Sequence, residues 1–337
     1  MKKNRYMQKA LNEAWKYQFL TYPNPAVGSC VVRDDEILSV EAHHQAGESH
    51  AEVNALKSAY LNLYPHSSLK DLTTSFDIHN FLLSNHNNFF NDCEIYVTLE
   101  PCNHIGKTPS CANLIKELKL KKVYIGTLDP NKDASGGLET LQKIGIDVEV
   151  GIEENSCKDL LIPFIRWQKD KFRFFKLAMR KDGTVSGGYI TTQDSLNLVH
   201  EIRTKLNLLI IGGNTVRLDR PTLDSRFAKI NKSSDILIYS RQNNFDNDIN
   251  LFNISSREVY ISDDIDFIKS NFSMCEGGYS LLNSIKDKID MLMIFISHKN
   301  DLEYVDTISK YGYIRVYSYF INKFDEIIFY KKLSMSK

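Results

Sequence analysis

The 337-residue chain lacks several features that mark common protein classes. Lysine plus arginine number 42, as do aspartate plus glutamate, so no excess charge points to nucleic acid or an anionic membrane as a partner. No apolar run approaches about 18 residues, the length that a membrane-spanning helix needs. Six cysteines are too few for a disulfide scaffold at this length. We therefore expect a cytoplasmic protein with a small-molecule substrate.

The length favours two domains, each large enough to fold alone. We expect the first over residues 1–150, a helical, charged connection over 151–171 and the second over 172–337. In the first domain, periodicity and turn residues predict a hairpin over 27–40 with its turn at Asp34-Asp35. Residues 61–92 show no sustained period and are expected to form an extended connection. The other predicted elements here are helices near 7–19, 50–60 and 112–120, and strands at 94–99, 123–126 and 147–150.

The second domain also alternates between strand and helix patterns, so both domains are expected to be α/β. It contains no G-x-G-x-x-G motif, so a dinucleotide would not be bound in the Rossmann manner. The predicted elements are a helix near 195–206 and strands at 172–179, 208–211, 236–239, 258–261, 291–297, 313–319 and 326–330.

Three potential metal ligands occur at element boundaries in the first domain. His50 begins a predicted helix, Cys102 follows a predicted strand, and Cys111 precedes another helix. Catalytic zinc typically takes three protein ligands and leaves one position for water. Glu52 lies two residues after the histidine ligand and is not needed as a ligand, so it can carry a proton as general base and acid. The pattern predicts a catalytic Zn²⁺ site.

Two simpler interpretations were weighed against this one. A lone histidine or cysteine is ordinarily a packing or surface residue, but His50-Ala51-Glu52 together with Pro101-Cys102 is a more specific combination. A purely structural zinc site would usually have four protein ligands and no adjacent acid. The remaining cysteines have no such neighbours and are expected to be buried packing residues, namely Cys30, Cys93, Cys157 and Cys275.

The motifs around these residues resemble those of the bifunctional deaminase-reductases of riboflavin biosynthesis. In the first domain they are Y-P-N-P-A-V-G at 22–28, H-H-Q-A-G-E-S-H-A-E at 43–52 and T-L-E-P-C-N-H-I-G-K-T-P-S-C at 98–111. Eight residues separate the two cysteines, whereas general nucleobase deaminases have P-C-x-x-C. In the second domain they are K-L-A-M-R-K-D-G at 176–183, G-G-N-T-V-R-L-D-R-P-T-L at 212–223 and E-G-G at 276–278.

The resemblance implies an α/β fold with a cytidine-deaminase-like three-layer domain followed by a dihydrofolate-reductase-like domain. It implies hydrolytic deamination of 2,5-diamino-6-(5-phosphoribosylamino)pyrimidin-4(3H)-one. NADPH-dependent reduction of the ribosyl side chain then gives 5-amino-6-(5-phosphoribitylamino)uracil. A homo-oligomer, dimer or tetramer, is expected with these activities.

The resemblance also assigns individual residues in both domains. Lys176 is expected to be catalytic in the reduction. The expected substrate contacts are Asn24, His43, His104 and Lys107 in the deaminase, and Arg203, Leu223, Arg226 and Glu276 in the reductase. The expected NADPH contacts are Ala178, Tyr189, Thr215, Asp219, Gly277 and Gly278.

The second domain departs from the family pattern at several positions. Arg180-Lys181 replace a usual Ser-Leu, Tyr189 stands where tryptophan is common, Arg220 replaces an aspartate, and the segment 184–188 is short. Two alternatives therefore remain open. One is a zinc deaminase that acts on tRNA or another pyrimidine, and the other is a degenerate second domain that only binds a nucleotide.

Overall fold

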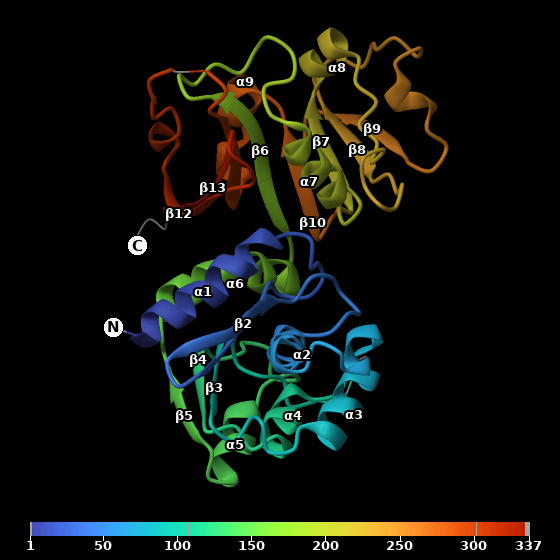
Figure 1. Ribbon diagram of the computed structural model, residues 1–337. Coiled ribbons are helices and arrows are strands. Elements are labelled where there is room, and N and C mark those ends of the chain that lie inside the picture. Colours follow the sequence, from blue (N-terminus) through green and yellow to red (C-terminus); the bar gives the residue numbers. More distant parts are fainter. Residues whose placement is uncertain (1, 105, 107, 301, 334–337) are drawn as a thin grey trace. The chain divides into compact units, whose positions relative to one another are not determined.

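A computed structural model describes residues 2–104, 106, 108–300 and 302–333, which form two compact units (Figure 1). Their bounds are Met1–Ile165 and Arg166–Lys337, so the division falls inside the expected connection. Helix α6 (Glu154–Lys169) occupies much of this connection. Its first part belongs to the first unit because Gln18 donates a hydrogen bond to the Leu160 carbonyl at 2.8 Å. None of the described helices is long and apolar enough to cross a membrane.

The first domain is built on a five-stranded sheet with the order β2-β1-β3-β4-β5. The predicted hairpin is confirmed, with Asp34 and Asp35 at φ of 50° and 67° in its turn. The strand β3 pairs antiparallel with β1 and parallel with β4, which in turn pairs parallel with β5. The strands are β1 (Gly28–Arg33), β2 (Glu36–Ala42), β3 (Cys93–Leu99), β4 (Lys122–Thr127) and β5 (Asp147–Val150).

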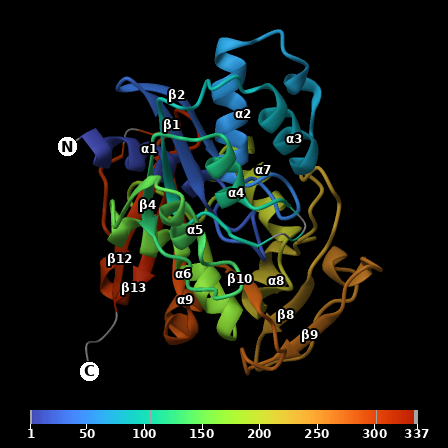
Figure 2. The same cartoon turned by 90° about the horizontal axis from the view of Figure 1, so that it is seen from below.

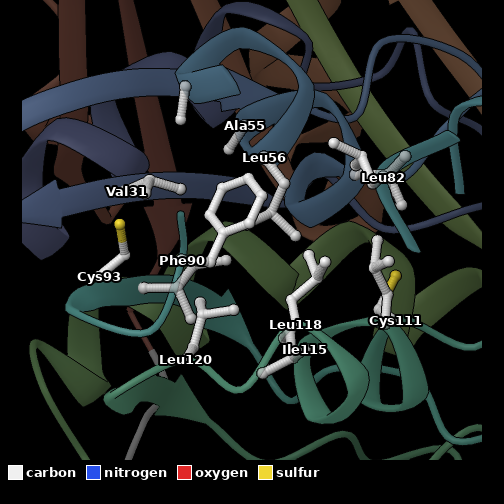
Figure 3. Close-up of a cluster of buried hydrophobic side chains, with 14 of the residues drawn as sticks. Val31, Ala55, Leu56, Leu82, Phe90, Cys93, Cys111, Ile115, Leu118 and Leu120 are labelled. Atoms are coloured by element: carbon white, nitrogen blue, oxygen red, sulfur yellow. The ribbon is translucent and has the colours of Figure 1, made fainter. Parts of the chain in front are cut away.

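Helices cover both faces of this sheet, which gives three layers (Figure 1). Alternate residues of β3 point to opposite faces, so Tyr96 stacks on Tyr124 and contacts Tyr6 of α1, whereas Ile95 and Val97 join the core beneath α2 and α4. Figure 3 shows Phe90 within that core. The helices are α1 (Lys2–Lys16), α2 (Ala51–Leu63), α3 (Ser75–Asn85), α4 (Cys111–Glu117) and α5 (Gly137–Lys143).

The expectation of an extended connection over 61–92 was wrong. This segment contains the end of α2, the short helix η1 (Ser68–Asp71) and all of α3, which lies beside α2 (Figures 1 and 2). Thr74 caps α3 by accepting a hydrogen bond from the Asp77 backbone N–H. The buried residues Ile78 and Leu82 have helical spacing, but His79 and Asn80 between them weaken the apolar period.

The second domain is a mixed eight-stranded sheet with the order β12-β13-β11-β6-β10-β7-β8-β9. Its centre is parallel, and β13 pairs antiparallel with β11 and β12. Besides α3, the sequence patterns do not predict α5, α8 (Gly213–Asp219) or the central strand β10 (Phe272–Glu276). Each of the last three has only five to seven residues, too short to establish a period.

The remaining strands agree with the predicted positions to within a few residues. They are β6 (Phe172–Arg180), β7 (Leu208–Gly212), β8 (Asp235–Tyr239), β9 (Val259–Ser262), β11 (Met291–Ser297), β12 (Tyr313–Phe320) and β13 (Asp325–Lys332). Helices α7 (Gln193–Arg203) and α9 (Tyr279–Ile285) accompany them, with the short helices η2 (Asn250–Asn253), η3 (Lys286–Lys288) and η4 (Ser309–Tyr311).

Candidate active sites

The three predicted zinc ligands meet in the first domain. His50 is the residue before α2, Cys102 lies in the loop after β3, and Cys111 is the first residue of α4. Their ligand atoms all lie within 4.8 Å of one another. The Nδ1 atom of His50 is 3.5 Å from the Cys102 sulfur and 3.4 Å from the Cys111 sulfur. One imidazole and two thiols converging in this way fit a Zn²⁺ ion with three protein ligands.

The local charges favour metal binding at this cluster. A hydrogen bond from the Cys111 thiol, with help from His50, lowers the pKa of Cys102 to about 4 against the opposing effect of burial. Sharing this proton raises the pKa of Cys111. Burial has the largest single effect on His50 and opposes its charge, but the hydrogen bond with Cys102 and the charges of Cys102 and Glu52 together raise the pKa of His50. The pair therefore already holds one negative charge, and a metal would favour loss of the second proton.

Glu52 lies in the first turn of α2, next to these ligands. It is only 4% exposed, and burial raises the pKa of its carboxyl to about 7, against the opposing effect of His50. A carboxyl group with a pKa near neutrality can both accept and donate a proton at cellular pH. The geometry supports the proton-carrying role predicted from the sequence.

Hydrogen bonds hold the loop that carries Cys102. The Ser110 hydroxyl donates to the Cys102 carbonyl at 3.0 Å and accepts from the Asn113 N–H at 3.1 Å, which caps α4. Glu100, only 6% exposed, accepts three backbone N–H bonds from residues 129, 136 and 138. Neither role was predicted from the sequence, although a serine directly before a predicted helix is a signal for a cap.

Asn24 and His43, two predicted substrate contacts, lie together. The Nδ1 atom of His43 is 3.0 Å from the Ser49 carbonyl, which can only accept, so this nitrogen carries the proton. Burial lowers the pKa of His43 to about 4, so its other nitrogen accepts from the Asn24 amide, 3.1 Å away. Both ring nitrogens are therefore occupied. This fixes the Asn24 amide group, whose carbonyl oxygen is the half able to accept from a substrate.

The other two predicted substrate contacts of the deaminase are on the loop between the cysteines. His104 is exposed there, whereas Lys107 lies outside the described residues. Thr108, which was not predicted, is buried with its hydroxyl 3.3 Å from Nε2 of His50. A partner on the second ring nitrogen orients a metal-ligating histidine.

Three predicted residues of the second domain also meet. The register of β6 against β10 pairs Lys176 with Glu276, and their side chains form an ion pair at 3.1 Å. Arg203 from α7 binds the other carboxylate oxygen at 2.7 Å. Burial alone would raise the pKa of Glu276, but the two cations hold it far below its usual range. The group carries a net positive charge at the carboxyl ends of parallel strands, where α/β sheets bind ligands.

Most of the predicted cofactor contacts lie on β6 or on the segments that directly follow β7 and β10. Ala178 continues β6, Gly277 and Gly278 connect β10 to α9, and Thr215 and Asp219 lie one turn apart on α8. Tyr189, in the segment before α7, is 83% exposed.

Of the two other predicted substrate contacts, Leu223 is buried and Arg226 is exposed, with its Nε atom 2.8 Å from a carboxylate oxygen of Asp224. His200, one turn before Arg203 on α7, is a neighbour that the sequence analysis missed. Its spacing from Arg203 was the available signal.

Known proteins resemble both parts of the chain. Residues 1–127 match the family model of the cytidine and deoxycytidylate deaminase zinc-binding region. The riboflavin biosynthesis protein RibD of Synechocystis is 37% identical over 212 residues, which cover 60% of this chain and 50% of that protein. RibD of Aquifex aeolicus is 35% identical and covers 67% of this chain and 58% of its own length. The chain therefore spans about half to three fifths of these relatives in the aligned regions.

The fold extends the likeness to the whole chain. The crystal structure of a diaminohydroxyphosphoribosylaminopyrimidine deaminase/5-amino-6-(5-phosphoribosylamino)uracil reductase from Thermotoga maritima matches with a TM-score of 0.64 at 24% identity. The match covers 98% of this chain and 99% of that one. The predicted fold class, a cytidine-deaminase-like domain followed by a dihydrofolate-reductase-like domain, is confirmed. The chain is thus a homologue of the riboflavin biosynthesis protein RibD, with the deaminase zinc-binding region in its first domain.

Proposed function

We propose that the chain is a bifunctional enzyme of riboflavin biosynthesis. Its first domain deaminates 2,5-diamino-6-(5-phosphoribosylamino)pyrimidin-4(3H)-one, and its second domain reduces the ribosyl group with NADPH to give 5-amino-6-(5-phosphoribitylamino)uracil. The observation that carries the proposal is the His50, Cys102 and Cys111 cluster with the buried acid Glu52 beside it. The RibD relatives support the assignment to riboflavin biosynthesis.

In the deaminase, the zinc ligands, Glu52 and Asn24 have separate roles. Zinc held by the three ligands would supply a Lewis acid that lowers the pKa of a bound water. Glu52 takes the proton that is released and passes it to the departing amine. The amide of Asn24, fixed by His43, orients the pyrimidine ring. Burial of Glu52 excludes bulk water from the proton transfer.

In the reductase, NADPH supplies the hydride, and Lys176 stabilises negative charge that develops on the sugar oxygen. Glu276 holds the ammonium group in place at 3.1 Å and links it to Arg203. Arg226, whose guanidinium is half exposed, is available to bind the substrate phosphate. Thr215 and Asp219 on α8, together with the turn at Gly277-Gly278, position the cofactor.

Two of the unusual residues of the second domain, Arg180 and Arg220, have defined local partners, which argues against a decayed domain. Arg180 donates hydrogen bonds to the carbonyls of Ser186 and Gly187 and so secures the short segment 184–188. Arg220 forms a 2.7 Å ion pair with Asp246. Both arginines make local contacts, and neither takes part in the ion pairs of Glu276 with Lys176 and Arg203.

The test uses the purified, zinc-loaded full chain. Ammonia release is measured with the free phosphoribosylamino pyrimidine and with tRNA, and nicotinamide absorbance is then followed after NADPH addition. The proposal expects ammonia release from the free pyrimidine alone and NADPH oxidation only after deamination. Deamination of tRNA would support the nucleic-acid alternative, and NADPH binding without oxidation would indicate a degenerate second domain.

We also propose a cytoplasmic homo-oligomer, dimer or tetramer, that works without nucleic acid. The balance of 42 basic and 42 acidic residues supports the absence of a nucleic-acid partner. We assign deamination to residues 1–150 and reduction to residues 172–337, joined by 151–171. Light scattering after size exclusion tests the assembly, and separate fragments divided between 165 and 166 test the assignment of activities.

A further inference from the structure

The segment from α8 to Arg226 contains strained backbone beside the proposed reductase site. Leu223 has a φ of 55°, a left-handed conformation that residues with a side chain rarely adopt. The residue is also only 9% exposed, so it is held inside the domain rather than in a free loop. Such strain persists only where surrounding contacts determine the backbone conformation.

Two arginines from other elements hold the backbone on both sides of Leu223. Arg203 donates from Nη1 to the Asp224 carbonyl at 3.0 Å. Arg257, which lies just before β9, donates from Nη1 to the Thr222 carbonyl at 3.1 Å. The carbonyl before the strained residue and the carbonyl after it are therefore each fixed by a guanidinium group.

Arg257 is a buried arginine whose guanidinium group is only partly hydrogen-bonded. It is only 8% exposed, and among the described residues its Nε and Nη2 atoms have no hydrogen-bond partner. Burial lowers the pKa of Arg257, Asp224 opposes this effect, and Arg203 adds to it. The two unpartnered atoms are closed to solvent, so a ligand does not reach them. The contact of Arg257 that bears on the site is its bond to Thr222.

We propose that Arg257 is a positioning residue for substrate binding in the second domain. By holding the Thr222 carbonyl it fixes the turn at Leu223 and so aims Arg226 at the phosphorylated substrate. This inference rests on the proposed reductase function. The hydrogen bond of Arg257 adds to others that connect the turn to Lys176. Arg203 joins the other side of the turn to Glu276, and Glu276 binds Lys176.

The test compares Arg257→Gln and Arg257→Lys with the wild-type full chain. Arg315→Gln is the control, because Arg315 is an exposed arginine on β12, at the opposite edge of the same sheet. Loss of one charge-assisted hydrogen bond corresponds to about a 10-fold effect. We expect Arg257→Gln to speed amide hydrogen exchange in residues 222–228 about 10-fold. We also expect it to raise KM for the deaminated substrate about 10-fold, while kcat and KM for NADPH change by less than about 2-fold.

Arg257→Lys keeps a cationic donor and should recover part of both effects, and Arg315→Gln should show neither. Unchanged exchange and unchanged KM in Arg257→Gln would overturn the proposal, as would a fall in kcat at constant KM. If Arg257→Gln does not fold, Arg257→Lys must show the same changes to a smaller degree, and wild-type values there would refute the role. Absence of reductase activity in the wild type would refute the proposed function. In that case, wild-type amide hydrogen exchange in residues 222–228 of the variants would separately refute the role of Arg257 in holding the turn.

Discussion

Replacing Glu52 with glutamine should have opposite effects on catalysis and on stability. The amide keeps the size of the side chain, and Glu52 is not among the three ligand residues, so zinc should still bind. The variant has no group that can carry the proton, a contribution typically worth about 10²- to 10⁴-fold in rate. We expect deamination to fall by that factor with full zinc content.

The stability gain follows from the burial of the carboxyl group. Burial raises its pKa from 4.5 to about 7, so the folded metal-free domain retains a proton that the unfolded chain releases. The stabilising effect of the neutral carboxyl is complete below about pH 4.5 and is lost as the pH rises through about 7. The difference of about 2.5 between the two pKa values corresponds to roughly 3 kcal/mol. Glu52→Gln should therefore stabilise the metal-free domain by up to roughly 3 kcal/mol at about pH 8, and hardly at about pH 4.

Urea unfolding of chelator-treated wild type and variant at both pH values measures the second effect. Ammonia release and metal analysis on the zinc-loaded proteins measure the first. Near-normal turnover with zinc bound would exclude Glu52 as the proton carrier. An equal stability difference at both pH values would show that ionisation of the buried carboxyl is not its cause.

Three further predictions concern other parts of the two sites. Substituting any one of the three zinc ligands should reduce zinc content and first-domain stability, and unchanged stoichiometric zinc by metal analysis would contradict the ligand set. Ser110→Ala should lower the free energy of unfolding by about 1 kcal/mol and weaken zinc binding, because the serine both caps α4 and holds the Cys102 carbonyl; urea titration and zinc competition measure these effects. Burial, with help from Arg203, lowers the pKa of His200 to about 4, so the unfolded chain binds a proton that the folded domain excludes as the pH falls below about 6.5. Second-domain stability should therefore drop by about 2 kcal/mol by about pH 5, and His200→Gln should flatten this dependence in pH-resolved unfolding curves.

The sequence predicted most of the fold where the elements are long or bounded by clear turn residues. Both domains, the hairpin at Asp34-Asp35 and strands such as β11 follow directly from alternation and periodicity. Helix α3 was not predicted because polar residues separate its buried positions. Strand β10 was not predicted because five residues in a sheet centre are too few to show a hydrophobic period. Short elements are determined by tertiary packing more than by local pattern.

The candidate sites show the same division. The zinc cluster could be predicted because ligand type and spacing are set by metal chemistry. The ion pairs of Glu276 depend on the pairing of β6 with β10, which no local pattern specifies. The roles of Ser110 and Arg257 depend on backbone carbonyls that become neighbours only in the folded chain. Because every residue type has a backbone carbonyl, the sequence does not indicate which residue will accept such a hydrogen bond.

The distribution of the cysteines has a consequence for chemical labelling. Cys30, Cys93, Cys157 and Cys275 are buried, and burial raises their pKa values to about 12, 11, 12 and 12. These thiols are therefore closed to alkylating reagents and oxidants while the protein is folded. Cys111 is also buried, and its pKa is raised. Cys102 is the exception among the six, with a low pKa and partial exposure. In the folded protein, a thiol reagent should therefore react at Cys102 alone. Because Cys102 is a proposed zinc ligand, the fraction of chains modified at one cysteine would measure how much of a preparation has lost its metal.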